Sequence, residues 1–307
     1  MSLHVFANIV TPFGTASNNR GENEGNITTL QKLIWQGESH SSVSAEAIRF
    51  SLRRLLADLD QKKTNRRWDE DSRVNAWQEP DFKSWSKKDA ETFIDDDLLG
   101  FMSPDAAREE GGRRAIVRRG VLEITRAVSL TPWPGDMVFN AASPGASPSA
   151  QKKGNNPAPY SAEIHATRYQ YGIALTPERL REKSRATKAL RALGNLCTVA
   201  GNHARFLYDF SPESIIIRIT DDPAPRILYC FETPDNGKTV AVPEILRKLD
   251  AEDLKAEEII AGGAMVGTLR ETLQGTDYGE AVTLFDGVKG ALDEACTRIN
   301  AKLGIKE

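Results

Sequence analysis

The sequence predicts an α+β fold in which an antiparallel sheet carries helices on one face. Two apolar runs, 3–10 and 214–220, are typical of buried strands. Two further segments, 45–59 and 177–193, place apolar residues at helical spacing. The order along the chain is strand, helix, strands, helix and strand, with long insertions between them. This order matches a ferredoxin-like βαββαβ core.

The first strand is expected over 3–10, where Asn8 is the only polar side chain in mid-strand. The polar, glycine-bearing stretch 11–26 is predicted to be a loop, and 27–35 has extended or mixed character. The serine-rich segment 39–44 is expected to be a second loop, leading into the helix at 45–59. Ser44 is a suitable N-cap for that helix. Its apolar stripe consists of Ile48, Leu52, Leu55, Leu56 and Leu59.

The middle of the chain contains two insertions. Residues 60–107 are strongly charged, with aromatic side chains scattered among the charges. After strand character at 115–130, residues 131–160 are rich in proline and glycine and are expected to be exposed. Strand-like segments at 136–140 and 161–175 flank this second stretch. We therefore expect a long hairpin with a disordered tip.

The last part of the chain is predicted to alternate helices and strands. Thr176 followed by Pro177 predicts the start of the helix at 177–193. Residues 227–233 have strand character, and 246–258 and 288–303 have helical character.

Composition excludes several protein classes. Of the 307 residues, 40% are hydrophobic and 27% charged, as in ordinary globular proteins, and no apolar run is long enough for a membrane span. The first residues do not resemble a signal peptide. The three widely spaced cysteines do not form a disulfide framework or a CxxC metal site. The sequence therefore predicts a cytoplasmic protein with no membrane partner.

Charge is unevenly distributed although the net charge is −3. Residues 108–126 hold six arginines against three glutamates, and 178–191 hold six basic residues against two acidic ones. Residues 248–307 hold seven basic against twelve acidic residues. This pattern indicates either a polyanion-binding face with acidic surface left for protein contacts, or solvated helix faces.

Motifs for catalysis and cofactor binding are weak. The sequence has no GxSxG, HExxH or Walker pattern. The glycines at 262–267 lack the GxGxxG order and a strong preceding strand, so a turn or a helix-packing role is expected. Asp95, Asp96 and Asp97 suit Mg²⁺ chemically, but three consecutive carboxylates cannot all face one ion. Exposed charge or a helix N-terminus is expected instead, with no catalytic residue, metal or cofactor.

Residues suited to binding a phosphate backbone occur in four places. Ser41 and Ser42 precede a helix N-terminus, and Arg49 and Arg53 lie one turn apart on that helix. Lys152 and Lys153 fall at the tip of the expected hairpin. The segment Gly201, Asn202, His203, Ala204 and Arg205 supplies a glycine for close approach and an arginine, and His203 suits either a hydrogen bond or an RNA contact. Such contacts give affinity without sequence preference.

Several of these segments also carry a family resemblance. They are the opening strand with Asn8, the serine-rich segment with SAEAIRFSLR at 44–53, DLLGFM at 97–102, the hairpin before Tyr169-Gln170-Tyr171, and GNHAR at 201–205. Over residues 3–220 the chain resembles the DevR/Cst-type backbone subunit of type I CRISPR Cascade, the repeated crRNA-binding Cas protein.

The resemblance implies an RRM-like palm, formed by 1–59 and 108–307, with a hairpin thumb at about 131–170 and a helical insertion at 60–107. It implies that copies assemble head to tail along crRNA beside other Cascade subunits, and that the target DNA strand is recognised through base pairing. The implied RNA-binding residues are Ser41, Ser42, Arg49, Arg53, Lys152, Lys153, Gly201, Asn202, His203 and Arg205.

Two departures from related proteins bear on activity. The first strand offers Phe6 and Phe13 but no RNP-type aromatic string, so base stacking on the sheet face is not expected. The loop after that strand has Glu22 and Glu24 but no aspartate, which favours a non-catalytic subunit. Two alternatives stay open: a metal-dependent RNA endonuclease that uses Glu22, Glu24 or the aspartates 95–97, and a protein-interaction module whose basic face meets an acidic partner.

Overall fold

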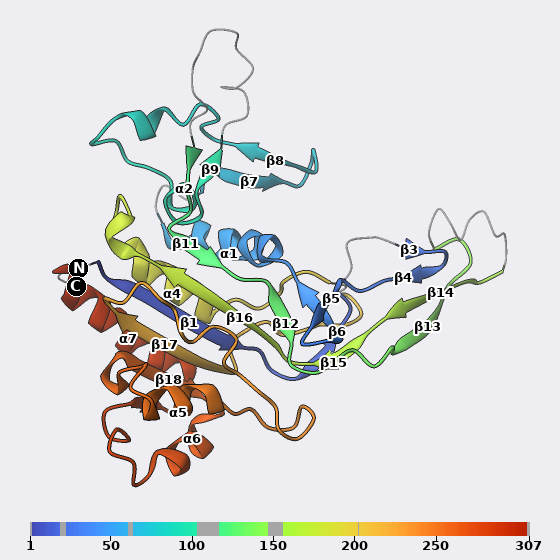
Figure 1. Ribbon diagram of the computed structural model, residues 1–307. Coiled ribbons are helices and arrows are strands. Elements are labelled where there is room, and N and C mark those ends of the chain that lie inside the picture. Colours follow the sequence, from blue (N-terminus) through green and yellow to red (C-terminus); the bar gives the residue numbers. More distant parts are fainter. Residues whose placement is uncertain are drawn as a thin grey trace.

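The computed structural model describes residues 2–18, 23–60, 64–102, 117–146, 156–201 and 203–305. It confirms the predicted α+β class (Figure 1). A nine-stranded sheet has the order β19-β18-β17-β1-β16-β12-β6-β5, and β11 also pairs with β16. These strands are β1 (His4–Val10), β5 (Lys32–Trp35), β6 (Glu38–Val43), β11 (Leu122–Ile124), β12 (Ala127–Ser129), β16 (Tyr169–Leu175), β17 (Ser214–Thr220), β18 (Ile259–Gly263) and β19 (Thr283–Phe285).

The centre of the sheet is buried on both faces. Strand β1 pairs antiparallel with β16 on one side and with β17 on the other. Its side chains alternate: Val5, Ala7 and Ile9 belong to one apolar cluster, whereas Phe6 and Val10 belong to another. Because successive strand residues point to opposite faces, each cluster covers one face of the sheet.

Helices α1 (Ala45–Leu59), α4 (Arg185–Gly194) and α7 (Val288–Leu303) cover the first face. The predicted helix at 45–59 is confirmed with its cap, because Ser44 Oγ accepts the backbone N–H of Ala47 at 3.3 Å. The helix predicted at 288–303 is also confirmed. The second face is covered by α5 (Pro243–Asp250), α6 (Val266–Leu273) and the segment between β17 and α5.

The predicted long hairpin is present as β13 (Met137–Ala142) and β14 (Ala158–Glu163), which pair antiparallel and extend away from the main sheet (Figure 1). Its tip, with Lys152 and Lys153, lies outside the described residues. The remaining strands form small sheets: β2 (Gly14–Ala16) with β15 (His165–Thr167), β3 (Asn23–Glu24) with β4 (Ile27–Thr28) beside β14, β7 (Arg66–Asp69) with β8 (Val74–Trp77), and β9 (Phe101–Met102) with β10 (Val117–Arg118).

The insertion at 60–107 is less helical than predicted. Its described residues contain the β7–β8 hairpin, the 3-10 helix η1 (Lys83–Ser86) and one short α-helix, α2 (Ile94–Leu99). The three consecutive aspartates form the first turn of α2, as one of the two alternatives predicted. They are buried rather than exposed, at 2% or less.

The serine-rich segment is a strand rather than a loop. Residues 38–43 form β6, which pairs with β5 on one side and with β12 on the other. The predicted single strand at 161–175 is also wrong, because that stretch is divided among β14, β15 and β16, which lie in three different sheets.

The helix predicted at 177–193 begins later than expected, because a residue far away in the sequence binds the backbone that precedes it. The 3-10 helix η3 (Pro177–Arg179) comes first, and α4 starts only at Arg185. Between them the backbone N–H groups of Arg181 and Glu182 bond to the carboxylate of Asp97, at 3.0 and 3.1 Å. Donors held in this way cannot take part in a helix.

The strand predicted at 227–233 is wrong for a similar reason. The backbone N–H of Tyr229 bonds to Asn8 Oδ1, and that of Phe231 bonds to Gln170 Oε1, both at 3.1 Å. Tyr229 has a φ of 54°, which is incompatible with a strand. The segment instead lies across the second face of the sheet.

The C-terminal elements differ slightly from the prediction. The helix expected at 246–258 runs from Pro243 to Asp250, with proline in its first turn, and the 3-10 helix η4 (Ala256–Glu258) follows. A strand, β18, does precede the glycine-rich segment, contrary to expectation. Within the parts of the chain that the structure describes, no helix has both the length and the apolar character needed to cross a bilayer.

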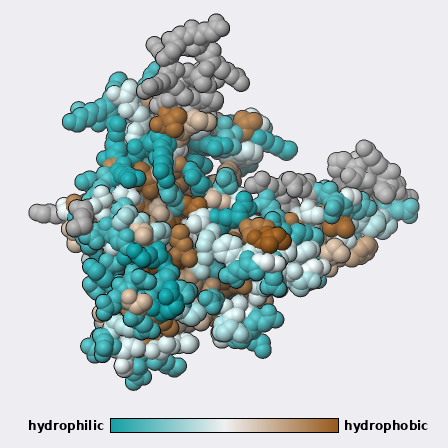
Figure 2. Space-filling model, viewed as in Figure 1, coloured by the Kyte–Doolittle hydropathy of each residue, from teal (hydrophilic) through white to brown (hydrophobic). Residues whose placement is uncertain are grey.

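The face seen in Figure 2 is mostly hydrophilic, with an apolar patch over β5, where Ile34 is 72% exposed.

Candidate nucleic-acid interface

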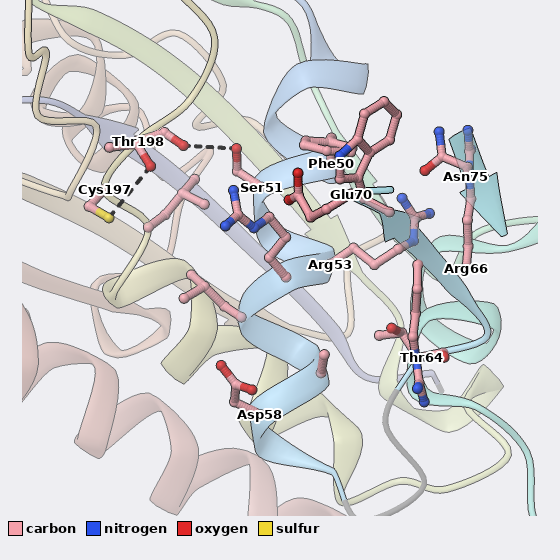
Figure 3. A pocket seen from close by; sticks show the side chains of 16 residues that line it. Phe50, Ser51, Arg53, Asp58, Thr64, Arg66, Glu70, Asn75, Cys197 and Thr198 are labelled. Atoms are coloured by element: carbon pink, nitrogen blue, oxygen red, sulfur yellow. Dashed lines mark hydrogen bonds between the residues drawn. The ribbon is translucent and has the colours of Figure 1, made fainter. Parts of the chain in front are cut away.

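Two hollows lie along helix α1 and share Arg53 and Arg66. The first, about 490 Å³, lies between α1, the β7–β8 hairpin and the loop after α4, and is called the α1–β7 hollow (Figure 3). The second, about 450 Å³, lies between α1 and β9 and is called the α1–β9 hollow. Volumes of this size are typical of ligand-binding clefts. The predicted pair Arg49 and Arg53 therefore lines concave surface, Arg49 in the second hollow and Arg53 in both.

The hollows have an excess of positive charge. The α1–β7 hollow has four arginines against Asp58 and Glu70: Arg53, Arg54, Arg66 and Arg67. The α1–β9 hollow has three arginines, Arg49, Arg53 and Arg66, against one glutamate. Burial, and to a smaller extent repulsion from Arg53, lowers the pKa of both Arg49 and Arg66. Cations that repel one another in a partly buried site favour the binding of an anion.

Buried carboxylates of α2 position this basic surface. Asp95 accepts from Arg53 Nε at 3.1 Å and from the backbone N–H groups of Asn65 and Arg66 at 2.7 and 3.1 Å. It therefore ties α1 to the β7–β8 hairpin. One turn earlier on α1, the Arg49 guanidinium donates to the carbonyl oxygen of Leu99, at the end of α2.

The other two aspartates face different partners. Asp96 accepts from Asn65 Nδ2 at 3.0 Å, and burial together with the charge of Asp95 raises the pKa of Asp96 to about 7. Asp97 accepts from Arg118 and from Arg185, the latter at 3.0 Å. The three carboxylates thus do not converge on one point. Among the described residues, no group of three or more His, Cys, Asp or Glu side chains is arranged to hold a metal ion.

Aromatic side chains alternate with the arginines. Phe50 and Trp68 line the α1–β7 hollow and are 39% and 41% exposed. Their ring centroids are 6.5 Å apart and their planes meet at 82°. Trp77 lines the other hollow, with the Arg66 guanidinium 5.6 Å from its ring. Exposed aromatic rings beside cations are the features with which proteins bind single-stranded nucleic acid.

The two predicted serines lie apart from the hollows, with their hydroxyls turned into the protein. Ser41 Oγ lies 2.6 Å from His165 Nδ1 and 2.6 Å from the hydroxyl of Tyr169. Ser42 Oγ accepts from Arg126 at 3.2 Å. Both serines are at most 1% exposed. Their contact with phosphate stays a prediction, and the structure gives each hydroxyl a partner inside the protein.

The loop after α4 connects the α1–β7 hollow with the β13–β14 hairpin. Near α1, the carbonyl oxygen of Thr198 accepts from Ser51 Oγ at 2.8 Å. Gly201 has a φ of 81°, and a Cβ there would lie 2.9 Å from Asn18 Oδ1, so the glycine is needed for packing within the protein, and its approach to a phosphate stays a prediction. The Arg205 guanidinium lies 4.8 Å from the ring of Tyr160 on β14.

His203 and Asn202 belong to the same loop. Both ring nitrogens of His203 are buried without a hydrogen-bond partner among the described residues. Asn202 lies outside the described residues.

Sequence reasoning missed Arg54, which follows the predicted Arg53 on α1, and two arginines of β7, Arg66 and Arg67. The signal for the β7 pair was the run Arg66-Arg67-Trp68, in which a basic pair precedes an aromatic residue within the charged insertion. The composition fits a nucleic-acid contact, but only the fold of β7 against α1 reveals which surface these residues share with Arg53.

Comparisons with known proteins agree on one family. Residues 12–235 match a family model described as "CRISPR-associated negative auto-regulator DevR/Csa2". The chain is 56% identical over 308 residues to "CRISPR-associated protein Cas7/Cst2/DevR" of Myxococcus xanthus strain DK1622, covering 98% of this chain and 99% of that protein.

Two solved structures share the fold, each at 13% identity and over 96% of this chain. One belongs to a "CRISPR RNA-guided surveillance complex, pre-nicking" (TM-score 0.57, all of its chain covered), the other to a "CRISPR RNA-guided surveillance complex" (TM-score 0.54, 99% covered).

Proposed function

This chain belongs to the DevR/Csa2 family of CRISPR-associated proteins, with a Cas7/Cst2/DevR protein as a relative, and we propose that it binds guide RNA as a repeated backbone subunit of a type I CRISPR Cascade complex. The observation that carries the proposal is the basic surface of α1, where Arg49, Arg53 and Arg66 gather and Arg53 is paired with the buried Asp95. A strand lying along α1 would place its phosphates against these arginines. Binding of this kind is independent of base sequence, as a guide-binding protein requires.

We propose that the central part of the large sheet is the RRM-like palm. The order of its strands supports this: β17-β1-β16 with β11 and β12 beside β16, and α1 and α4 at the two crossovers. The palm would comprise 1–59 and 108–307, with the thumb at about 131–170 and the insertion at 60–107.

The second face of that sheet leaves no open surface for bases at its centre. Asn8 and Gln170, on the two central strands, bond to the backbone of Tyr229 and Phe231, which lie across them. The route over α1 is therefore favoured over the sheet face that ordinary RRM domains use. Contacts by Ser41, Ser42, Lys152, Lys153 and the loop from Gly201 to Arg205 would extend the α1 site.

The partners follow from the same proposal. The matched solved chains come from RNA-guided surveillance complexes, which supports crRNA and other Cascade subunits as partners. Copies would associate head to tail along the guide in the cytoplasm, and target DNA would be recognised by pairing with the guide.

We propose a non-catalytic role. The carboxylates that an endonuclease would recruit are already bound to protein donors: Asp95 to Arg53, Asp96 to Asn65, and Asp97 to Arg118 and Arg185. Glu24 is exposed on its own short strand, and Glu22 lies outside the described residues. The endonuclease alternative therefore gains no support. Incubation of labelled RNA with the protein and Mg²⁺ or Mn²⁺ should leave the RNA intact.

The test of RNA binding is the double variant Arg49→Ala with Arg53→Ala. A gel-shift titration of single-stranded RNA over a range of salt should show weaker binding for every RNA sequence. The salt dependence should also be shallower, because about 0.7 counterions are released per phosphate contact on a single strand. The matched control is Arg247→Ala with Arg270→Ala, which removes the same charge from exposed helix faces in the C-terminal part.

Thermal melting should accompany the titration, because Arg53 also pairs with buried Asp95. A folded double variant that binds RNA as tightly as the original protein would refute the site. Failure of the original protein to bind single-stranded RNA at low salt would refute the proposed function.

A further inference from the structure

We propose that the α1–β7 hollow receives one unstacked base of the RNA strand that lies along α1. This inference rests on the proposed function and adds to it a specific contact with a nucleobase. It assigns a role to a surface that phosphate contacts alone leave unexplained, because phosphate binding needs cations but no aromatic walls.

The walls of the hollow suit a flat, aromatic ligand. Phe50 on α1 and Trp68 on β7 meet edge to face, so each keeps part of a ring face open to the cavity. A ligand that covers these rings would remove apolar surface from water, which is favourable. Any base can stack on them, since every base has a π-face, and this preserves independence from guide sequence.

The charges suit the phosphate attached to that base. Arg54 is exposed at the hollow and makes no hydrogen bond or ion pair with any residue that the structure describes. The Nε of Arg66 is buried and likewise has no partner among them. By contrast, Arg53 is already paired with Asp95 and Arg67 donates to the carbonyl oxygen of Thr64 at 3.1 Å. Two guanidinium groups therefore retain donors for an anion at the edge of the hollow.

The hollow is formed before any ligand binds. Ser51 joins α1 to the loop at Thr198, and Asp95 fixes the start of β7 against α1. Figure 3 shows Phe50 and Arg53 on the side of α1 where Arg66 and Asn75 of the hairpin lie, whereas Ser51 points towards Thr198. A preformed cavity lowers the entropic cost of holding a base.

The chain carries its own reporter for this site. Cys197 lines the α1–β7 hollow and is exposed, whereas Cys230 and Cys296 are 4% and 1% exposed. A maleimide should therefore alkylate Cys197 first in the folded protein. A base seated in the hollow should shield this thiol.

The experiment compares an oligouridine of about ten nucleotides with an abasic ribose-phosphate strand of the same length. About ten nucleotides lies within the usual size of one single-strand binding site. With the full chain at low salt, the oligouridine should slow alkylation of Cys197 severalfold, and the abasic strand should not. Trp68→Ala should weaken oligouridine binding by roughly fivefold or more, the smallest effect expected from losing one base stack. It should leave the affinity for the abasic strand unchanged, and Trp68→Tyr should restore most of the loss.

Val74→Ala is the matched control, because Val74 is exposed on the same hairpin but does not line the hollow. If the protein binds oligouridine while Cys197 reacts at its free rate, the base does not enter the hollow. Equal weakening of both strands by Trp68→Ala would likewise overturn the inference, and both results leave the proposed function intact. Failure of the original protein to bind either strand would instead overturn the proposed function.

Discussion

Replacement of Asp97 by asparagine should destabilise the protein more than any other single change of charge at the start of α2. Asp97 is fully buried, and its carboxylate accepts from the side chains of Arg118 and Arg185 and from the backbone N–H groups of Arg181 and Glu182. Arg185 is only 1% exposed. The substitution keeps the shape of the side chain but leaves two arginines facing a neutral amide.

The magnitude follows from the burial of the pair. Removing one partner of a buried ion pair costs about 3–5 kcal/mol. The lower end of this range is expected here, because Arg185 keeps the carboxylates of Asp60 and Glu182 at 3.7 and 3.3 Å. With a urea m-value of about 3 kcal/mol/M, this cost shifts the unfolding midpoint down by roughly 1 M or more. Asp97 also fixes the segment before α4, so the whole loss should appear in the global transition.

Urea unfolding followed by circular dichroism measures this shift. The matched control is Asp81→Asn, which breaks the pair between Asp81 and Lys83, whose side chains are 63% and 75% exposed. The control should leave the midpoint unchanged, since exposed pairs contribute little. If Asp97→Asn moved the midpoint no further than the control, the argument from burial would be wrong.

Three other expectations concern pH and backbone conformation. Burial and the charge of Asp95 raise the pKa of Asp96 to about 7 from its ordinary 3.8. Between about pH 4 and 7 the folded state therefore retains a proton that the unfolded chain releases, and the free energy of unfolding should fall as pH rises. Asp96→Asn should remove this fall, and an unchanged pH profile of the urea midpoint would contradict it. Burial lowers the pKa of His165 to about 4 from 6.5, so its contribution has the opposite sign: stability is lost as pH falls from 6.5 towards 4. His165→Gln should reduce the fall of the urea midpoint between pH 6.5 and 4. An equally steep fall in the variant would show that other groups cause it. Gly263 has a φ of 105°, and a Cβ there would lie 2.1 Å from the carbonyl oxygen of Glu213, so Gly263→Ala should cost roughly 2 kcal/mol or more. Gly267→Ala on α6 meets nothing within 4 Å and should stabilise slightly, so equal melting temperatures for the two variants would refute this reading.

The sequence predicted those parts of the fold that local patterns determine. The helix at 45–59 has both a cap at Ser44 and a complete apolar stripe, and the strands at 3–10 and 214–220 are apolar runs of the right length. The hairpin was visible from strand-like segments on both sides of a proline- and glycine-rich stretch.

The errors occurred where distant residues take over backbone hydrogen bonds. Nothing near Arg181 indicates that Asp97 will bind its N–H and delay the helix. Nothing near Tyr229 indicates that Asn8 will hold it out of a strand. The serine-rich segment is predicted to be a loop but forms β6, where Ser41 has buried partners on β15 and β16.

The sequence predicted two of the arginines that α1 contributes to the candidate site but not the residues of the β7–β8 hairpin. Arg49 and Arg53 could be found because helical spacing places them on one side of α1. Arg66 and Trp68 could not, because their place opposite α1 depends on Asp95, which follows them by almost thirty residues and holds the start of β7.

The covering of the second sheet face limits how this chain can be shortened. The family match ends at residue 235, yet Phe6, Val10 and Ile216 are sealed from water by residues of α5 and α6, including Ile245, Leu249, Val266 and Leu269. A fragment cut at the end of the match would carry a bare apolar surface across its central strands. Such a fragment should aggregate when expressed alone, so the acidic C-terminal part is an integral part of the core rather than an appendage.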